Sequence, residues 1–175
     1  MWQIRPEERD DARMIEAVVA RNFGPGRTAK SAYRLREGVA PEAGLGFVAI
    51  EDGILKGSVR FWPIAVGRER ALLLGPLTVE TKERGRGIGL ALMQRGIEEA
   101  RAHRHRAILL VGDAVYYSRV GFAPVPEGRV TFPGPVDPAR VLALGLCDGA
   151  FESLQGPIRR AQIDDPVCAD GAPVA

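Results

Sequence analysis

The chain has 175 residues, of which 46% are hydrophobic and 26% are charged, and its formal net charge is +2. This length and composition indicate one domain with a substantial core, and the near balance of charge argues against broad nucleic-acid binding. The longest nearly apolar run, residues 71–79, is far shorter than the roughly 20 residues that a membrane-spanning helix needs.

The amino-terminal part of the chain predicts a strand followed by two helices. The strand is expected at residues 2–5, and Asp10 or Asp11 can cap the first helix. A second helix is expected at residues 27–38, where a glycine ends it. The apolar stripe of the first helix is expected to consist of Ile15, Val18, Val19 and Phe23.

Three strands are expected next. Residues 45–66 are typical of two strands joined by an Asp-Gly hairpin turn, because this dipeptide adopts positive φ at little cost. A turn at residues 67–70 leads into an almost wholly apolar strand at residues 71–79, which should be buried on both faces. The Gly75–Pro76 pair within it indicates a bulge, or a place where the strand parts from a neighbour. A strand that begins only at Leu77 explains the pair equally well.

The second half of the chain predicts a long helix and several short elements. The helix and a buried strand at residues 107–111 complete a strand–helix–strand unit. Asp113 can cap a short helix, short strands are expected at residues 120–122 and 128–132, and a helix is expected near residues 138–146. The apolar face of the long helix should consist of Leu90, Met93, Ile97 and Ala100.

The stretch KERGRGIGLALM, residues 82–93, places three glycines between a buried strand and a helix. Free backbone N–H groups and the positive end of the helix dipole make such a turn a site for anions. Two known phosphate motifs are excluded. A P-loop needs Lys and then Ser or Thr after its last glycine, but Leu90 and Ala91 follow Gly89. The dinucleotide fingerprint needs a small residue where Leu90 stands. A connection that binds no ligand remains the alternative.

A third pattern fits the turn. Arg84, Gly87 and Gly89 spell R-x-x-G-x-G, and VYYSRVGF follows at residues 115–122, one helix and one strand later. Both motifs, in this order, resemble those of the GNAT acetyltransferase superfamily, and residues 4–122 are similar to its YhbS-like bacterial branch. The resemblance implies an α/β (α+β) fold with a mixed, mostly antiparallel sheet flanked by helices, in which the fourth and fifth strands splay apart.

The resemblance also implies where acetyl-CoA binds. Its pantetheine arm would form hydrogen bonds with the backbone of the fourth strand, and its pyrophosphate would bind the amides of the glycine turn. Arg84 would brace the loop or add charge, unless it is an exposed arginine at the helix entry. The cofactor-binding residues implied in this way are Leu77, Thr78, Val79, Arg84, Gly85, Arg86, Gly87, Ile88, Gly89, Leu90 and Tyr117.

The implied reaction is direct transfer of acetyl from CoA to a primary amine. Tyr117, four residues before Gly121, stands at the position of the general acid in this family. A tyrosine with a pKa of about 10 is protonated near neutrality and can donate to the departing thiolate. The alternative is a tyrosine that packs on the core. Glu80 and Asp113 are candidate bases, but Asp113 may equally be needed as a helix cap and Glu80 may be a solvated turn carboxylate. A water chain, or no dedicated base, remains open.

The resemblance further implies one catalytic domain at residues 1–165, a flexible tail at residues 166–175, a cytoplasmic location and an unidentified amine as acceptor. In such proteins acceptor specificity arises from the early helices and the carboxyl-terminal strands, here residues 125–154. Relatives often form a homodimer through a sheet edge. Two rival functions are an acyl-CoA sensor without turnover and a nucleotide-binding regulator.

Two further sequence features bear on ligands. Lys30, Arg34 and Arg36 favour either an acidic acceptor or, more simply, a solvated helix face. The two cysteines and two histidines lack metal-ligand spacing, so no metal site is expected and the thiols should be reduced. These residues are Cys147, Cys168, His103 and His105.

Overall fold

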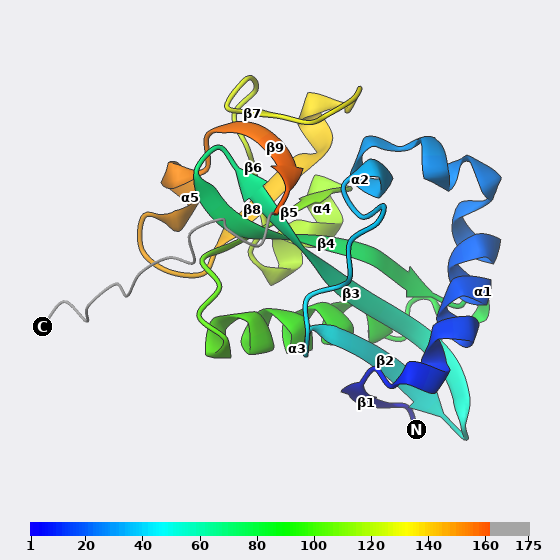
Figure 1. Ribbon diagram of the computed structural model, residues 1–175. Helices are drawn as coiled ribbons and strands as arrows, with labels where there is room; N and C mark the ends of the chain where they lie inside the picture. Colours follow the sequence, from blue (N-terminus) through cyan, green and yellow to red (C-terminus); the bar gives the residue numbers. More distant parts are fainter. Residues whose placement is uncertain (162–175) are drawn as a thin grey trace, which may run out of the picture.

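The structure is a computed structural model that describes residues 1–161 of the chain (Figure 1). The tail expected at residues 166–175 and Cys168 lie outside the described residues. The described strands are β1 (Gln3–Pro6), β2 (Gly46–Glu51), β3 (Ile54–Val66), β4 (Glu69–Val79), β5 (Ala107–Val111), β6 (Ala123–Pro124), β7 (Val130–Thr131), β8 (Val141–Gly145) and β9 (Gly156–Arg160). The described α-helices are α1 (Ala12–Phe23), α2 (Ser31–Arg34), α3 (Ile88–Ala102), α4 (Ala114–Tyr117) and α5 (Ala150–Ser153).

The strands form a mixed, mostly antiparallel sheet, as expected. Its order is β1-β2-β3-β4-β5-β8-β6. Two of the described strands lie off this path: β9 pairs with β3, and β7 pairs with β9. Within the described residues, only β4 with β5 and β7 with β9 are parallel pairs. The parallel β4–β5 pair requires a crossover connection, and α3 supplies it.

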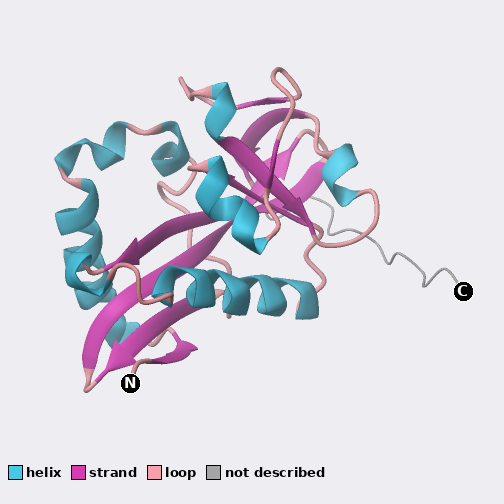
Figure 2. Cartoon of the chain, turned by 180° about the vertical axis from the view of Figure 1, so that it is seen from behind, coloured by secondary structure: helices cyan, strands magenta, loops and turns pink. Residues whose placement is uncertain are grey.

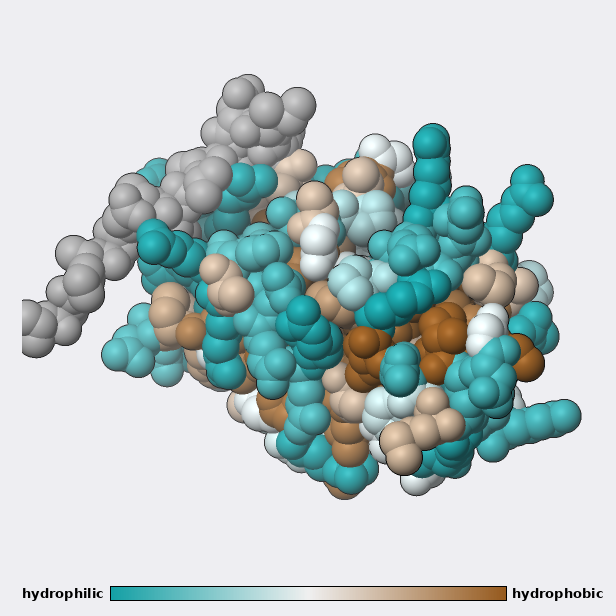
Figure 3. All heavy atoms as spheres, turned by 90° about the horizontal axis from the view of Figure 1, so that it is seen from below, coloured by the Kyte–Doolittle hydropathy of each residue, from teal (hydrophilic) through white to brown (hydrophobic). Residues whose placement is uncertain are grey.

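Helices cover both faces of the sheet, and the alternation of side chains along the strands explains why (Figure 2). Phe47 and Phe61 pack in the core that includes Met93 of α3. Val48, next to Phe47, instead packs with Ile15 of α1. A third apolar cluster joins β3, β8 and β9 to the segment that follows α2. On the face seen from below, where α3 lies, hydrophilic residues predominate over smaller hydrophobic areas (Figure 3).

Two local predictions about the strands are confirmed. The β2–β3 hairpin turns at Asp52 and Gly53, with φ of 53° and 75°. The register between β3 and β4 shifts between Val59 and Phe61, opposite the Gly75–Pro76 pair. A bulge is therefore present, and the alternative of a strand that begins at Leu77 is wrong because β4 runs from Glu69.

Two predictions about the carboxyl-terminal half are wrong. Residues 120–122 form no strand, since a 3₁₀ turn (Ser118–Val120) is followed by β6 at Ala123–Pro124. Residues 141–145, expected in a helix, form strand β8 beside β5. A short apolar run has the same appearance in a buried strand as in a buried helix, so the neighbouring strand decided its conformation.

The amino-terminal helices also differ in detail from the predictions. Asp11 precedes α1 but its side chain makes no capping bond to it; the carboxylate accepts from Arg5 and from the Glu8 amide instead. Phe23 is 40% exposed, outside the buried stripe. The helix expected at residues 27–38 divides into a 3₁₀ turn (Pro25–Ala29) and the single turn of α2.

Candidate active site

An opening between β4 and β5 is the central feature of the site. The two strands pair only at Leu72 with Ile108 and at Leu73 with Leu109. Beyond this point β4 continues to Val79 along β3, while β5 stays paired with β8. The two strands therefore part after Leu73, which is the splay that the sequence resemblance implied.

The part of β4 beyond the bulge presents backbone groups to this opening. The Glu80 amide points toward β3 and donates to Lys56 O of that strand at 2.8 Å. Because the hydrogen-bonding direction alternates along an antiparallel pair, Leu77 and Val79 direct their N–H and C=O groups away from β3. Val79 O accepts from Asn22 Nδ2 of α1 at 3.0 Å, which agrees with this direction. This edge of β4 can therefore bind an extended amide ligand as an added strand would.

Thr78 alternates with these residues and has a structural role. Its side chain is buried, and its hydroxyl accepts from Asn22 Nδ2 at 2.5 Å. Asn22 thus fastens the end of α1 to β4 at the margin of the opening. Nothing in the sequence indicated Asn22, because its partners are 56 and 57 residues away along the chain.

The glycine turn provides unoccupied backbone donors at the far end of β4. Helix α3 begins at Ile88, and its first backbone bond joins the Ala91 amide to Gly87 O at 3.0 Å. The amides of Ile88, Gly89 and Leu90 therefore have no partner within the helix. Gly87 has φ of 79° and ψ of 0°, the left-handed conformation that glycine adopts most easily.

Space above the turn is open in the described structure. A Cβ built on Gly85 or on Gly87 would meet no atom within 4 Å. Both residues are exposed, and Gly85 also has positive φ, at 83°. Amides without a partner in the first turn of a helix, next to two exposed glycines with open space around them, are suited to an anionic group.

The two arginines of the turn have different surroundings. Arg86 Nη1 donates to Glu51 Oε2 at 2.9 Å, and Arg86 also pairs with Glu83. The hydrogen bond from Arg86 to Glu51, with that of the chain's amino terminus, lowers the pKa of the Glu51 carboxyl to about 2. Arg86 therefore braces the loop against β2. Arg84 is exposed, and its side chain has no hydrogen bond or ion pair to residues 1–161. Of the two arginines in the turn, Arg84 is the one whose guanidinium is available to bind an anion.

Tyr117 reaches the same opening from the β5 side. It lies at the end of α4, and a Cβ on Gly112, the residue after β5, would collide with its ring. Its ring packs edge-on against Phe122 at a centroid distance of 6.0 Å and against Tyr116 at 5.2 Å. Its hydroxyl forms no hydrogen bond within the described part of the chain. The ring is thus fixed by packing while its hydroxyl has a free proton to donate.

Burial determines the protonation of Tyr117. It raises the pKa of this phenol to about 12, with a further rise from Tyr116 and an opposing effect of Arg140 and Arg36. Tyr117 is therefore protonated throughout the neutral range. Tyr116 differs in position, because its hydroxyl lies against Gly89 of α3 and its ring packs on the core.

Both candidate bases are held by other groups. Glu80 follows β4 and accepts a hydrogen bond from Arg21 Nη2 of α1 at 2.5 Å. Asp113 caps α4, where its Oδ1 accepts from the Tyr116 amide at 2.9 Å. One oxygen of each carboxylate is therefore already occupied by a hydrogen bond within the protein. Asp113 therefore has the capping role that the sequence left open as its alternative. Glu80 is not the solvated turn carboxylate of its alternative, because it is paired with Arg21.

A pair of Asp113 variants separates capping from catalysis. We expect Asp113→Asn to preserve the melting temperature and to keep kcat within about threefold, because Asn caps helices as well as Asp does. Asp113→Ala should destabilise the chain by about 1 kcal/mol, since the cap is lost. Thermal denaturation and a thiol-release assay measure the two effects. A large loss of kcat in a stable Asp113→Asn variant would instead identify Asp113 as the base.

Arg36 is a feature that the sequence did not reveal. Lys30 and Arg34 are exposed, as a solvated helix face predicts, but Arg36 is partly buried and its Nε is fully buried without a hydrogen-bond partner. A Cβ on Gly75 would lie 2.7 Å from Arg36 Nη2. The prediction of a solvated side chain is therefore wrong for Arg36, because the turn after α2 directs it toward the β4 bulge.

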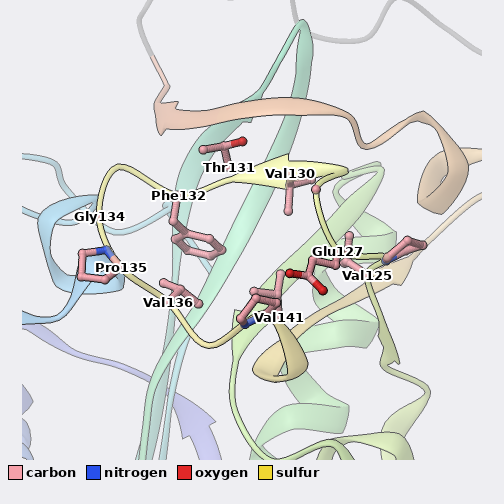
Figure 4. A pocket seen from close by; sticks show the side chains of 12 residues that line it. Val125, Glu127, Val130, Thr131, Phe132, Gly134, Pro135, Val136 and Val141 are labelled. Carbon is pink, nitrogen blue, oxygen red and sulfur yellow. The ribbon is translucent and has the colours of Figure 1, made fainter.

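A cavity of about 260 Å³ lies in the carboxyl-terminal region where the resemblance places acceptor specificity. Apolar side chains including Phe132 and Val141 line it, with the Glu127 carboxylate among them (Figure 4). Ser31 of α2 donates its hydroxyl to Pro135 O on the lining at 2.9 Å. This hydrogen bond joins the cavity lining to α2, which lies in the other region expected to contact an acceptor.

Two searches of the described residues bear on other ligands. Residues 1–161 contain no group of three or more His, Cys, Asp or Glu side chains placed to hold a metal ion. Over the same residues, no helix has the length and apolarity required to cross a membrane.

An opening between the fourth and fifth strands, with the glycine turn at one end and a tyrosine across it, is characteristic of CoA-dependent N-acyltransferases. The sequence profile described as "Acetyltransferase (GNAT) family" matches residues 12–122. The chain belongs to this family.

Individual relatives agree with this assignment. The chain is 34% identical over 158 residues to the N-acetyltransferase YhbS of Escherichia coli (strain K12), covering 87% of this chain and 92% of the relative. It is also similar to the crystal structure of E. coli YhbS in complex with CoA, with a TM-score of 0.76, 30% identity and coverage of 91% and 89%. A family acetyltransferase from Brucella melitensis, in complex with acetyl-CoA, has a TM-score of 0.59, 27% identity and coverage of 86% and 98%.

Proposed function

We propose that this chain binds acetyl-CoA in the β4–β5 opening and transfers the acetyl group directly to a primary amine. The observation that carries the proposal is the parting of β4 from β5 after Leu73, with the open amides of α3 at the far end of the same strand. The pantetheine arm would lie along Leu77 and Val79, and the pyrophosphate would bind the glycine turn. The CoA and acetyl-CoA complexes of the two related structures support this arrangement.

The amides and side chains of the turn have distinct parts in this proposal. The backbone amides of Gly85, Arg86, Gly87, Ile88, Gly89 and Leu90 would surround the pyrophosphate, where the helix dipole favours negative charge. Arg84, free of partners among the described residues, would add a positive charge, while Arg86 holds the loop in shape. The Arg86 amide already donates to Glu83 O at 3.4 Å, so it would have to be shared with the ligand. The turn is formed before the ligand arrives, which reduces the entropy cost of binding.

The chemistry follows from the geometry. The neutral amine attacks the thioester carbonyl carbon, a C–N bond forms, and the C–S bond breaks as the thiolate leaves. Tyr117 would give its phenolic proton to that sulfur, since its hydroxyl is protonated and has no partner within the described residues. The ammonium formed on attack loses its proton to water or to a base. Because Glu80 and Asp113 are both held by other groups, water is the better-supported acceptor for this proton.

The test is thiol release from acetyl-CoA with a panel of primary amines, combined with melting curves in the presence of acetyl-CoA, ATP and NAD. We expect stabilisation by acetyl-CoA alone and amine-dependent release of CoA. Tight binding of acetyl-CoA without acetylation of any amine would favour the sensor. Stabilisation by ATP or NAD and not by acetyl-CoA would favour the nucleotide-binding regulator and contradict the proposal.

A further inference from the structure

Arg36 has surroundings that are unusual for a charged side chain. Its Nε is fully buried without a hydrogen-bond partner, and its guanidinium forms no hydrogen bond or ion pair with any residue from 1 to 161. Arginine is rarely buried unless it is paired, because removing its charge from water costs free energy that only a partner restores. The described residues therefore include a guanidinium whose charge no protein anion neutralises.

No acidic side chain of the described residues provides that anion. The nearby groups that interact electrostatically with Arg36 are the hydroxyls of Tyr33 and Tyr117. Burial accordingly lowers the pKa of Arg36 to about 10, a cost that an adjacent negative charge would relieve. By contrast, Arg60 of β3, which is buried, has Glu7 within hydrogen-bonding distance at 2.8 Å.

The position of Arg36 connects it with the acyl-transfer point. Its Nη2 lies against Gly75, two residues beyond the last pair that β4 makes with β5. Tyr117 lies on the other side of the opening, against Gly112 after β5. Arg36 and Tyr117 are near enough to interact electrostatically across this opening.

The phosphates of the cofactor are not suitable partners for Arg36. They are assigned to the turn that follows Val79, at the opposite end of the free part of β4. Four residues of extended strand separate Gly75 from Val79, a span of about 13 Å. A ligand group next to Arg36 therefore belongs to the acceptor side of the opening.

We propose that Arg36 binds a carboxylate of the acceptor, so that the substrate is a small amine that itself carries a carboxylate. This inference rests on the acetyl-transfer function proposed above and specifies its acceptor class. A guanidinium presents two parallel N–H donors that match a carboxylate. A single arginine with two neutral tyrosines beside it suits a single negative charge better than a dianionic phosphate.

The experiment compares amino acids with their carboxamides. Glycine, β-alanine and γ-aminobutyrate are assayed beside glycinamide, β-alaninamide and γ-aminobutyramide, with wild type and with Arg36→Gln. For the acids, kcat/KM should fall on the order of 10- to 100-fold in the variant, the range for loss of a hydrogen bond to a charged group. For the amides it should change by less than about threefold. The amine pKa differs within each pair but cancels when the two proteins are compared.

Two further variants control the result. Arg36→Lys keeps the charge and should restore part of the activity toward the acids. Arg34→Gln removes an exposed arginine two residues away, whose guanidinium has no ion pair within the described residues, and should not change the preference for acids over amides. Equal losses for acids and amides in Arg36→Gln would contradict the proposal, since they would place Arg36 in the transfer step or in folding.

A readout without turnover keeps the proposal testable if every acceptor is slow. Arg36→Met should raise the melting temperature of the free protein by roughly 2 to 4 °C, because it removes a buried charge that lacks a partner. Propionate, but not propionamide, should stabilise the CoA-bound wild type and fail to stabilise Arg36→Gln. Equal effects of both ligands, or none on either protein, would overturn the carboxylate site. Failure of acetyl-CoA itself to bind would contradict the proposed function instead.

Discussion

Replacing Tyr117 by phenylalanine is expected to lower kcat by about 10²- to 10⁴-fold, the usual contribution of a general acid. The ring would still pack against Phe122 and Tyr116, so the fold and the affinity for acetyl-CoA should be nearly unchanged. What disappears is the proton for the departing thiolate. Thiol-release kinetics measure kcat, and calorimetric titration with CoA measures affinity. A variant that works at full speed would remove Tyr117 from the mechanism.

Tyr116→Phe is the matched control, because it removes a phenol one residue away whose hydroxyl faces Gly89. We expect its kcat to stay within about threefold of wild type, since a packing hydroxyl supplies no proton to the reaction. If Tyr116→Phe is the slower variant, the acid has been assigned to the wrong tyrosine.

The pH dependence gives an independent check on Tyr117. Burial raises the pKa of its phenol to about 12, so the acid stays protonated as pH rises through the range in which the acceptor amine loses its proton. The rate should therefore increase with pH up to the pKa of the amine and then level off. It should not fall again below about pH 10, the pKa of an unperturbed tyrosine. A steep loss of rate between about pH 8 and 9 in the stable protein, about one to two units below the ordinary tyrosine pKa, would contradict this assignment.

Replacing Gly87 by valine is expected to weaken acetyl-CoA binding by about 10²- to 10⁴-fold, the loss of two or so hydrogen bonds to a charged group. The new side chain would occupy the open space in front of the α3 amides, where no atom lies within 4 Å of a Cβ in the described structure. Calorimetric titration measures the effect directly. Unchanged affinity in a folded variant would exclude the turn as the phosphate site.

Backbone strain is the main complication for Gly87→Val, and Gly149→Val controls for it. Gly149 also precedes a helix, has φ of 74° and ψ of −4°, and has no atom within 4 Å of a built Cβ. Gly87 has nearly the same angles. The two variants should therefore lose similar stability, because both force valine into the left-handed region. Only Gly87→Val should lose affinity for acetyl-CoA.

The local elements of this protein could largely be predicted from its sequence. The Asp-Gly hairpin, the amphipathic pattern of α3 and the Gly75–Pro76 bulge each depend on residues that are close together in the chain. Their backbone preferences and apolar periodicity act locally, so they are visible without the rest of the fold. The glycine turn belongs to this group, since the spacing of three glycines before a helix already indicated an anion site.

Strand β8 was mistaken for a helix because its apolar run is compatible with both structures, and only the free edge of β5 selects the strand. The parting of β4 from β5 is likewise decided between strands that are far apart in the sequence. Neither property belongs to a single segment of the chain.

By itself, the sequence determined the family resemblance that implies the cofactor, because the turn and the tyrosine motif are contiguous patterns with a fixed order. The tertiary structure alone decided which side chains are available for chemistry. Asp113 and Glu80 are engaged by α4 and by Arg21, and Arg86 is engaged by Glu51. Arg36, which resembled a solvated residue, is partly buried beside the β4 bulge, and its Nε is fully buried without a partner among the described residues. Pairing and burial arise only when distant segments meet, and for this reason the acceptor side of the site could not be derived from local pattern.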